Sequence, residues 1–351
     1  MLPQLSTTDL AFTLTTSGGP LGLEFLGPTL RGLFGYGLRA VACPHASDQN
    51  GRCCAPDCCD YAHLFEGIPP PSLGTHRNEY TAVPQPFVLL VDPPRSVASA
   101  PNAPPVIKFV IRLFGDRAIA LTPSVIRAVE SRTKVGIGPQ RAAFRVSHVE
   151  QAAPQSIPVG APLLLSQHAP DSVARLDFLT PLSLRHGGKA ITNPTAADLV
   201  ESGRRRLWLL ARCYGDAAAT HIPMPAPGAK AVFRTREAEW KPWRIVRHSG
   251  RQHCAVGLGG VLGHIVIAGP WQHEQWWLQT CHIVGVGRCG TFGFGRVDVK
   301  CSADNASATH CRADVAEAQT VTNFDANDHR GRKRLPRWIN LRGLPPLRPS
   351  V

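Results

Sequence analysis

Long apolar segments are missing from this sequence of 351 residues. No run of about 18 apolar residues occurs, the length that a membrane-spanning helix requires. The first residues, MLPQLSTTDLAF, have neither the basic start nor the apolar core of a signal peptide. No predicted helix sets a basic stripe opposite a broad apolar face, as a helix lying on a membrane would. These absences predict a cytoplasmic protein that binds no membrane.

Acidic residues are also few. Charged residues make up 18% of the chain, and 38 Lys and Arg against 25 Asp and Glu give a formal net charge of +13 at pH 7. A basic surplus favours a polyanionic partner, and since a membrane is disfavoured, we expect a nucleic acid. A zinc-containing DNA-binding regulator would need a recognition helix rich in Arg, Asn and Gln, and no predicted helix has that composition.

The eleven cysteines do not fit a disulfide framework, because their number is odd and five of them lie in one short loop. The five are Cys43, Cys53, Cys54, Cys58 and Cys59. With His45 and His63 nearby, they offer enough ligands for a tetrahedral structural zinc. A loop without metal and a loop with a disulfide remain alternatives. A catalytic metal is not expected, because thiolate-rich sites close the coordination sphere.

Apolar periodicity predicts an α+β protein in which the order βαββαβ occurs twice. The first unit has strands at 9–14, 87–91, 106–113 and 143–149, a helix from Gly27-Pro28 to Ala42 and a helix at 122–131. The second has strands at 173–184, 243–257, 261–268 and 291–299, the middle two joined at Gly259-Gly260, with helices at 193–214 and 270–282. This order is typical of ferredoxin-like (RRM-like) domains, so the sequence predicts two of them in tandem.

The expected N-terminal domain spans residues 1–155 and contains the cysteine-rich loop 43–63 as an insertion. Gln, Ala and Pro around 151–162 indicate a linker. The expected C-terminal domain spans 156–300, and 301–351 form a tail. From Arg330 to Val351 the tail has seven Lys or Arg, four Pro and no acid, which predicts a flexible basic arm for nucleic acid or a neighbouring subunit. A merely solvated terminus is the alternative.

The stretch from Gly285 to Gly295, GVGRCGTFGFG, has five glycines in eleven residues. Gly285, Gly287 and Gly290 fit the dinucleotide motif G-x-G-x-x-G, but that motif must follow a strand and open a helix, and here the predicted order is reversed. A backbone without Cβ atoms can approach a phosphate closely, so we expect a phosphate-binding loop, with a purely structural turn as the alternative. The expected RNA contacts in or beside the glycine turns are Gly285, Gly287, Arg288, Gly290, Arg296, Arg251 and Arg141.

Four stretches resemble the CRISPR repeat-processing endoribonucleases of the RAMP superfamily. They are LRGLFGYGLRAVAC in the first helix, Cys59 to Glu66, Trp240-x-x-Trp243-Arg244 followed by Ser249-Gly250-Arg251-Gln252, and His282 to Gly295. The resemblance runs from about Leu26 to Val299. It implies two ferredoxin-like domains, a role in antiviral defence, and cleavage of precursor CRISPR RNA beside a repeat hairpin. It also implies retention of the mature guide RNA, contact with other CRISPR effector subunits, and Gln252 as an RNA contact.

Metal-independent RNA cleavage of this kind needs a base, an acid and cations that face the phosphorane. The candidates around the first helix are His45, Arg31, Arg39 and Tyr36, with His63 as a weaker one. The products would be 2′,3′-cyclic phosphate and 5′-hydroxyl ends, formed without a catalytic cofactor. The first helix contains no histidine, although the family often carries its catalytic histidine there, which keeps open the alternative of a non-catalytic RNA-binding subunit.

Overall fold

A computed structural model describes most of the chain. The described residues are 3–16, 23–44, 53, 58–80, 82–94, 106–138, 140–159, 173–222, 233–249, 254–269, 275–302 and 339–340. Within these residues, no helix combines the length and the apolar character needed to span a lipid bilayer.

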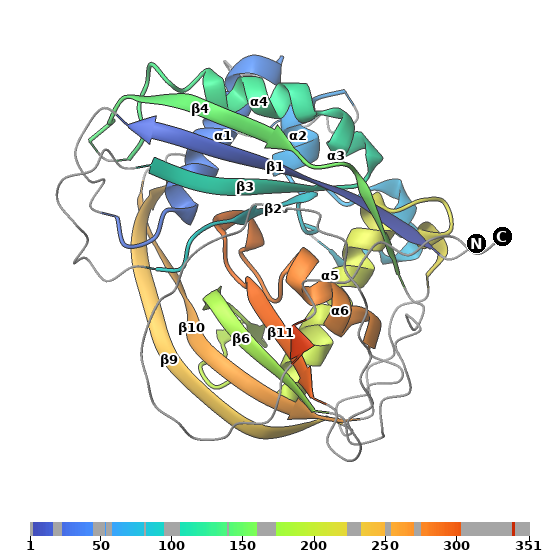
Figure 1. Cartoon of the computed structure of the whole chain (residues 1–351). Helices are drawn as coiled ribbons and strands as arrows, with labels where there is room; N and C mark the ends of the chain where they lie inside the picture. Colours follow the sequence, from blue (N-terminus) through green and yellow to red (C-terminus); the bar gives the residue numbers. More distant parts are fainter. Residues whose placement is uncertain are drawn as a thin grey trace, which may run out of the picture.

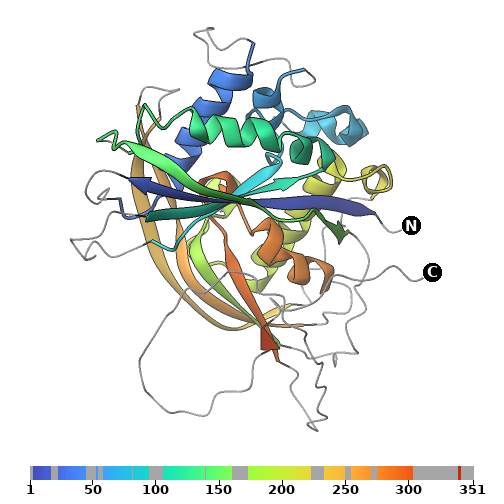
Figure 2. The same cartoon turned by 45° about the horizontal axis from the view of Figure 1, so that its top comes forward.

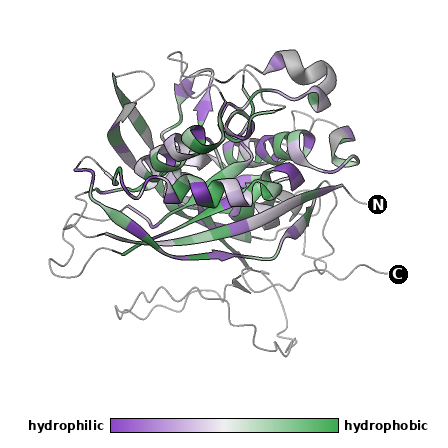
Figure 3. Ribbon diagram, turned by 90° about the horizontal axis from the view of Figure 1, so that it is seen from above, coloured by the Kyte–Doolittle hydropathy of each residue, from purple (hydrophilic) through white to green (hydrophobic). Residues whose placement is uncertain are grey.

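The first sheet is antiparallel and has the strand order β2-β3-β1-β4 (Figure 1). Its strands are β1 (Gln4–Thr16), β2 (Phe87–Leu90), β3 (Val106–Phe114) and β4 (Phe144–Gln151). Buried and less buried residues alternate along β1, and Figure 3 shows how hydrophobic and hydrophilic residues are distributed over the strands and helices. This strand order is the ferredoxin-like one, as the sequence predicts.

Helices cover one face of the first sheet. They are α1 (Gly27–Ala42), α2 (Asp60–Phe65), α3 (Asp116–Ala120) and α4 (Thr122–Glu130), with a 3-10 segment, η1 (Pro71–Glu79), before β2. Pro28 occupies the first turn of α1, where its missing N–H costs nothing. Gly37 lets α1 lie against the Ala128 carbonyl of α4, where a Cβ would overlap that oxygen. Phe34 packs edge-on against Phe65 and Phe87, with ring centroids 5.0 and 5.2 Å apart.

The second sheet has the order β12-β11-β6-β10-β9, which repeats the same topology with one added edge strand. Its strands are β6 (Val173–Leu182), β9 (Arg234–Ser249), β10 (Cys254–Ala268), β11 (Val297–Ser302) and β12 (Ile339–Asn340). Its helices are α5 (Ala196–Tyr214), η2 (Ala219–His221) and α6 (Gln275–Val284), and a small hairpin is made by β7 (Arg185–His186) and β8 (Lys189–Ala190). Figure 2 shows β9 and β10 as a long curved ribbon beside the rest of the sheet. The chain therefore contains two tandem ferredoxin-like domains.

The hairpin of β9 and β10 corrects one prediction. The two strands are joined across residues 250–253, whereas Gly259 and Gly260 lie inside the ladder, opposite Arg244 and Trp243. A Cβ on Gly260 would overlap the Leu182 carbonyl of β6. The glycine pair therefore marks the close approach of a neighbouring strand and not a turn.

Two boundaries also differ from the prediction. The strand expected from Thr291 begins only at Val297, because Gly290–Phe292 form a 3-10 turn, η5, and a bend follows. The expected linker contains β5 (Gln155–Pro158), which pairs with the start of β1, since β1 extends beyond β4 and leaves backbone groups to satisfy. Within the expected tail, Asn340 pairs with Lys300 of β11; residues 303–338 and 341–351 lie outside the described part of the chain.

Side chains of one domain bind the backbone of the other at several points. Arg112 of β3 makes two hydrogen bonds to the Asp9 carboxylate, 2.6 and 2.7 Å, and donates a third to the Ile283 carbonyl of α6, 3.0 Å. The Tyr214 hydroxyl of α5 donates to the Pro84 carbonyl before β2, 2.8 Å. The domains therefore form a common interface around β2, β3 and α6.

Candidate functional site

The glycine-rich loop between α6 and β11 lies at this interface. Gly293 has φ +81°, and a Cβ there would come within 2.6 Å of Val91 Cγ2 in the first domain. A Cβ on Gly290 would lie 3.0 Å from Val88 Cγ1 of β2. The glycines thus let the loop pack tightly against protein, so the structural role that was the alternative interpretation accounts for much of the glycine content.

Arg288 projects from this loop to solvent. Its backbone N–H donates to the Ser183 carbonyl, 2.9 Å, while its side chain is exposed. Gly287 has φ +78°, and a Cβ there would lie 2.6 Å from the same carbonyl oxygen. Cys289 also has positive φ, +66°, which is uncommon for a residue with a side chain. The turn is therefore held rigidly by backbone contacts and presents one arginine outward.

Four arginines lie near enough to Cys289 for their charges to act on the pKa of its thiol. Burial raises the pKa of the Cys289 thiol, and the charges of the four act in the opposite direction. They are Arg31 of α1, Arg185 of β7, Arg247 of β9 and Arg288 of the loop, which we term the arginine cluster. They come from both domains and from four separate segments. Such a concentration of guanidinium groups has the chemistry that a polyanion requires.

The ring of Phe292 helps to hold two members of the arginine cluster together. The guanidinium carbons of Arg31 and Arg247 lie 4.4 and 4.9 Å from the ring centroid. The Nε of Arg31 also donates to Thr291 Oγ1, 3.2 Å. Cation–π attraction partly offsets the repulsion between the two cations, so the pair is fixed before any ligand arrives.

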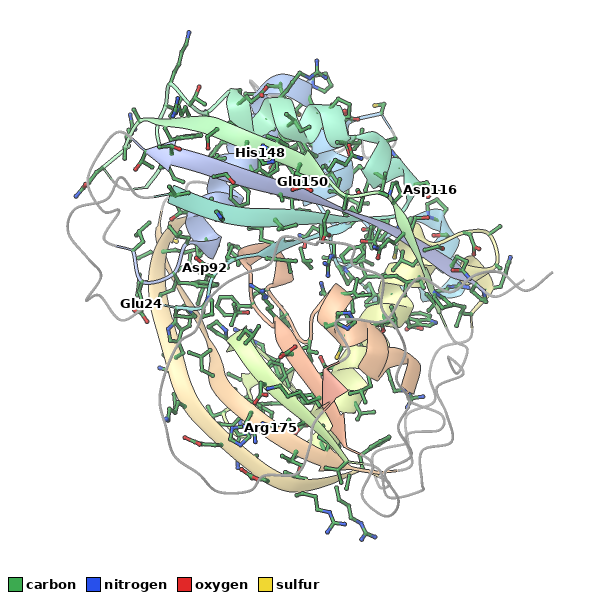
Figure 4. All side chains as sticks on the ribbon, viewed as in Figure 1. Glu24, Asp92, Asp116, His148, Glu150 and Arg175 are labelled. Carbon is green, nitrogen blue, oxygen red and sulfur yellow. The ribbon has the colours of Figure 1, made fainter. Side chains whose placement is uncertain are left out.

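Aromatic residues attach β9 to this site. Trp243, Phe25 and Phe294 pack edge-on against one another, with centroid distances of 5.3 to 5.7 Å. The Trp243 indole N–H donates to Glu24 Oε1, 2.7 Å, and Figure 4 shows Glu24 beside the ribbon of β9 and β10. The segment before α1, β9 and the glycine loop are thereby joined, which positions Arg31, Arg247 and Arg288 relative to one another.

A fifth arginine, on α5, supports the start of the glycine-rich loop. Arg206 of α5 donates from Nε to the Val284 carbonyl at the end of α6, 2.7 Å, and burial lowers its pKa to about 10. Arg185, Arg206 and Arg247 are not among the residues predicted from the sequence. For Arg206 the local signal was the run Arg204-Arg205-Arg206 on a predicted helix. For Arg185 and Arg247 there was none, because a single segment does not indicate that distant arginines meet.

The predicted catalytic residues fall into separate places. Arg31 belongs to the arginine cluster, whereas Arg39 lies over the Tyr61 ring, 5.7 Å from its centroid and roughly 12 Å further along α1. Tyr36 is 52% exposed and faces Arg132, whose guanidinium lies 5.8 Å from the ring centroid. His45 lies outside the described residues.

Four more residues were predicted to contact RNA: Arg296, Arg141, Arg251 and Gln252. Arg296 donates from Nη1 to the Val91 carbonyl, 3.1 Å, so its guanidinium joins the two domains. Arg141 is exposed at the tip of a turn with φ +49°, next to the bridge between Ile137 and Ala142. Arg251 and Gln252 lie outside the described residues.

His63 is a half-buried packing residue. Burial, with a smaller contribution from the charge of Arg117, lowers its pKa to about 4. Its ring stands edge-on to Tyr214, with centroids 5.9 Å apart. His63 is therefore neutral at physiological pH.

Three of the five predicted metal ligands come together. Cys43, Cys53 and Cys59 are buried and carry no disulfide, and their sulfur atoms all lie within 4.8 Å of one another. The disulfide alternative is therefore wrong for these three. Cys58 is exposed, and Cys54 lies outside the described residues.

The fold is that of a tandem ferredoxin-like protein, with the arginine cluster at the junction of the two domains. Residues 5–171 match the family model AF_1859_N, described as an N-terminal domain, and residues 176–297 match the model of the CRISPR-associated endoribonuclease Cas6. The second domain therefore matches the Cas6 endoribonucleases, which confirms the resemblance to CRISPR repeat-processing enzymes.

Solved structures with this fold include a Cas6 product complex, with 14% identity, a TM-score of 0.50, and coverage of 83% of this chain and 98% of that chain. A Thermus thermophilus Cas6 matches with 14% identity and a TM-score of 0.46, covering 84% and 98%. A Cas6-related protein from Pyrococcus furiosus has 11% identity and a TM-score of 0.43, with the same coverage. No curated protein sequence gives a significant match.

Proposed function

We propose that this protein cleaves precursor CRISPR RNA within the repeat without a catalytic metal and keeps the mature guide RNA bound. The observation that carries the proposal is that Arg31 of the first domain and Arg247 of the second lie over one ring, Phe292, in a chain whose second domain matches the Cas6 model. Guanidinium groups from both domains face one place there, so one RNA segment can contact both domains at once.

The chemistry requires attack of the 2′-hydroxyl on the adjacent phosphorus and cleavage of the bond to the 5′-oxygen. The proton of the 2′-hydroxyl passes to a base, and an acid supplies a proton to the leaving oxygen. The products are a 2′,3′-cyclic phosphate and a 5′-hydroxyl. Arg31 and Arg288 are proposed to stabilise the negative charge on the phosphorane. His45, which lies outside the described residues, is the candidate acid or base from the sequence.

Binding to the repeat hairpin would use the remaining basic groups. Arg247 and Arg185 extend the arginine cluster along the second domain, and Arg141, Arg251 and Gln252 are the proposed contacts further out. Because the cluster draws on both domains, dissociation of the product requires the loss of several phosphate contacts together, which supports retention of the guide RNA. Other effector subunits would then contact this protein with its guide RNA still bound.

The test uses a synthetic repeat hairpin in single-turnover cleavage. Cleavage should persist in excess EDTA and should stop when one 2′-deoxy sugar precedes the scissile bond, with that RNA still bound. A hairpin whose single 2′-deoxy sugar lies at another position is the matched control. Loss of cleavage in EDTA with unchanged protein stability would overturn the metal-independent mechanism.

A non-catalytic RNA-binding subunit is the second candidate. The observation that favours it is that α1 contains no histidine in its sequence. Tight binding of its own repeat hairpin without any cleavage over hours would decide for this alternative.

A further inference from the structure

We propose that Cys43, Cys53 and Cys59 bind one structural zinc ion, which fastens the C-terminal end of α1 to the N-terminal end of α2. Cys43 directly follows α1, and Cys59 directly precedes α2. Cys53 comes from the loop between them. Their exposed fractions are 8, 3 and 0%, so the metal would be enclosed by protein.

The distances suit zinc with little rearrangement. The three sulfur atoms lie within 4.8 Å of one another. Zn–S bonds of about 2.3 Å in a tetrahedral site hold sulfur atoms about 3.8 Å apart, so each sulfur needs to move inward only slightly. Three thiolates are soft ligands, which select zinc over magnesium or calcium.

Ordinary packing explains the arrangement less well. A buried cysteine often acts as a small apolar side chain, and each of the three alone would be unremarkable in a core. Here three free thiols from three positions along the chain lie close enough for one metal ion to bind all of them, and packing alone does not account for that arrangement. A disulfide would join two and exclude the third.

The proposed zinc site has a consequence for the arginine cluster. The ring of Phe65 on α2 packs against Phe34 of α1. The guanidinium carbon of Arg31 lies over the same ring, 5.3 Å from its centroid. Holding the end of α1 to the start of α2 therefore restricts the position of Arg31. This step rests on the proposed function, whereas the metal site itself does not.

The first experiment measures metal content in protein purified without added metal and under reducing conditions. We expect about one zinc per chain, lost in each of the variants C43S, C53S and C59S. The control C281S also removes a buried thiol, but from α6, and should keep the zinc. Retention of the zinc in all three variants would contradict the assignment of the ligands.

A second experiment needs no variant, in case the serine variants do not fold. Wild-type protein stripped of zinc and reloaded with Co²⁺ should show the absorption of cobalt–thiolate bonds. A zinc ratio near zero in wild-type protein, together with no such absorption on adding Co²⁺, would overturn the proposal. Both measurements are made without RNA, so a failure of the proposed RNA cleavage leaves them unaffected.

Discussion

At the scale of single residues, the site depends on arginines that approach one another. Two cations over one phenyl ring repel each other, and they stay together because the ring, a threonine hydroxyl and the packed glycine loop fix their positions. A site prepared in this way spends little free energy on reorganisation when negative charge develops in the transition state.

Arg31→Ala should therefore slow single-turnover cleavage of the repeat hairpin by at least about 10²-fold, because it removes one cation that faces the phosphorane. Arg39→Ala is the matched control, since it removes the same group from the same helix at a position over Tyr61. Its cleavage rate should stay within a few-fold of wild type. Equal losses in the two variants would contradict the separation of Arg31 from Arg39.

His63 predicts a dependence of stability on pH. Its pKa in the folded protein is lowered to about 4, below the value of about 6.5 in an unfolded chain. The unfolded chain therefore binds the proton more readily, so the contribution of neutral His63 is complete above about pH 6.5 and is lost as the pH falls toward 4. His63→Phe should reduce the loss of urea resistance over this range. An unchanged pH profile would show that other groups control it.

At the scale of elements, the loops are shaped by what packs against them. Gly293 and Gly188 have nearly the same φ, +81° and +80°. A Cβ at position 293 would lie 2.6 Å from Val91 Cγ2, whereas a Cβ at position 188 would have nothing within 4 Å. A comparison of alanine substitutions at these two positions therefore separates the cost of backbone strain from the cost of steric overlap.

Gly188→Ala should cost about 1 kcal/mol of unfolding free energy, the cost of positive φ for a residue with a Cβ. Gly293→Ala should cost the same strain and about 1 to 3 kcal/mol more, because the interface with the first domain must move. Urea unfolding of the two variants measures the difference. Equal losses would mean that the glycine loop does not press against Val91.

Much of this element level could be predicted from the sequence, because helix starts and strand alternation are local. Gly27-Pro28 gave the beginning of α1 and the apolar pattern gave both βαββαβ units. The turn predicted at Gly259-Gly260 was wrong, because the sequence does not distinguish a glycine inside a strand from a glycine in a turn. Arg185 and Arg247 were missed because their meeting with Arg31 depends on how the domains pack, which no single segment records.

At the scale of the whole molecule, Arg112 connects the first domain to the element that precedes the glycine loop. It is held by Asp9 and donates to the Ile283 carbonyl near the C-terminal end of α6, where a cation also suits the helix dipole.

Arg112→Met should therefore destabilise the fold by about 1 to 3 kcal/mol, since Asp9 loses its partner and the end of α6 loses a donor. Backbone amides at the end of α6 and in the glycine loop should exchange with deuterium faster than in wild type. Arg112→Lys keeps the charge beside Asp9 but has no forked guanidinium to reach both partners. Its exchange rates should lie between those of wild type and Arg112→Met. Unchanged exchange around Ile283 would show that Arg112 does not stabilise the loop.

The register of β1 has a consequence for how the chain folds during synthesis. Thr7 pairs with Phe114, and Gln4 pairs with Pro158. Every partner of this first strand is therefore made long after it, so β1 leaves the ribosome with both edges open and waits for β3, β4 and β5. Such non-local pairing slows folding and leaves an exposed strand meanwhile. Nascent chains stalled before β3 should therefore depend most on a chaperone.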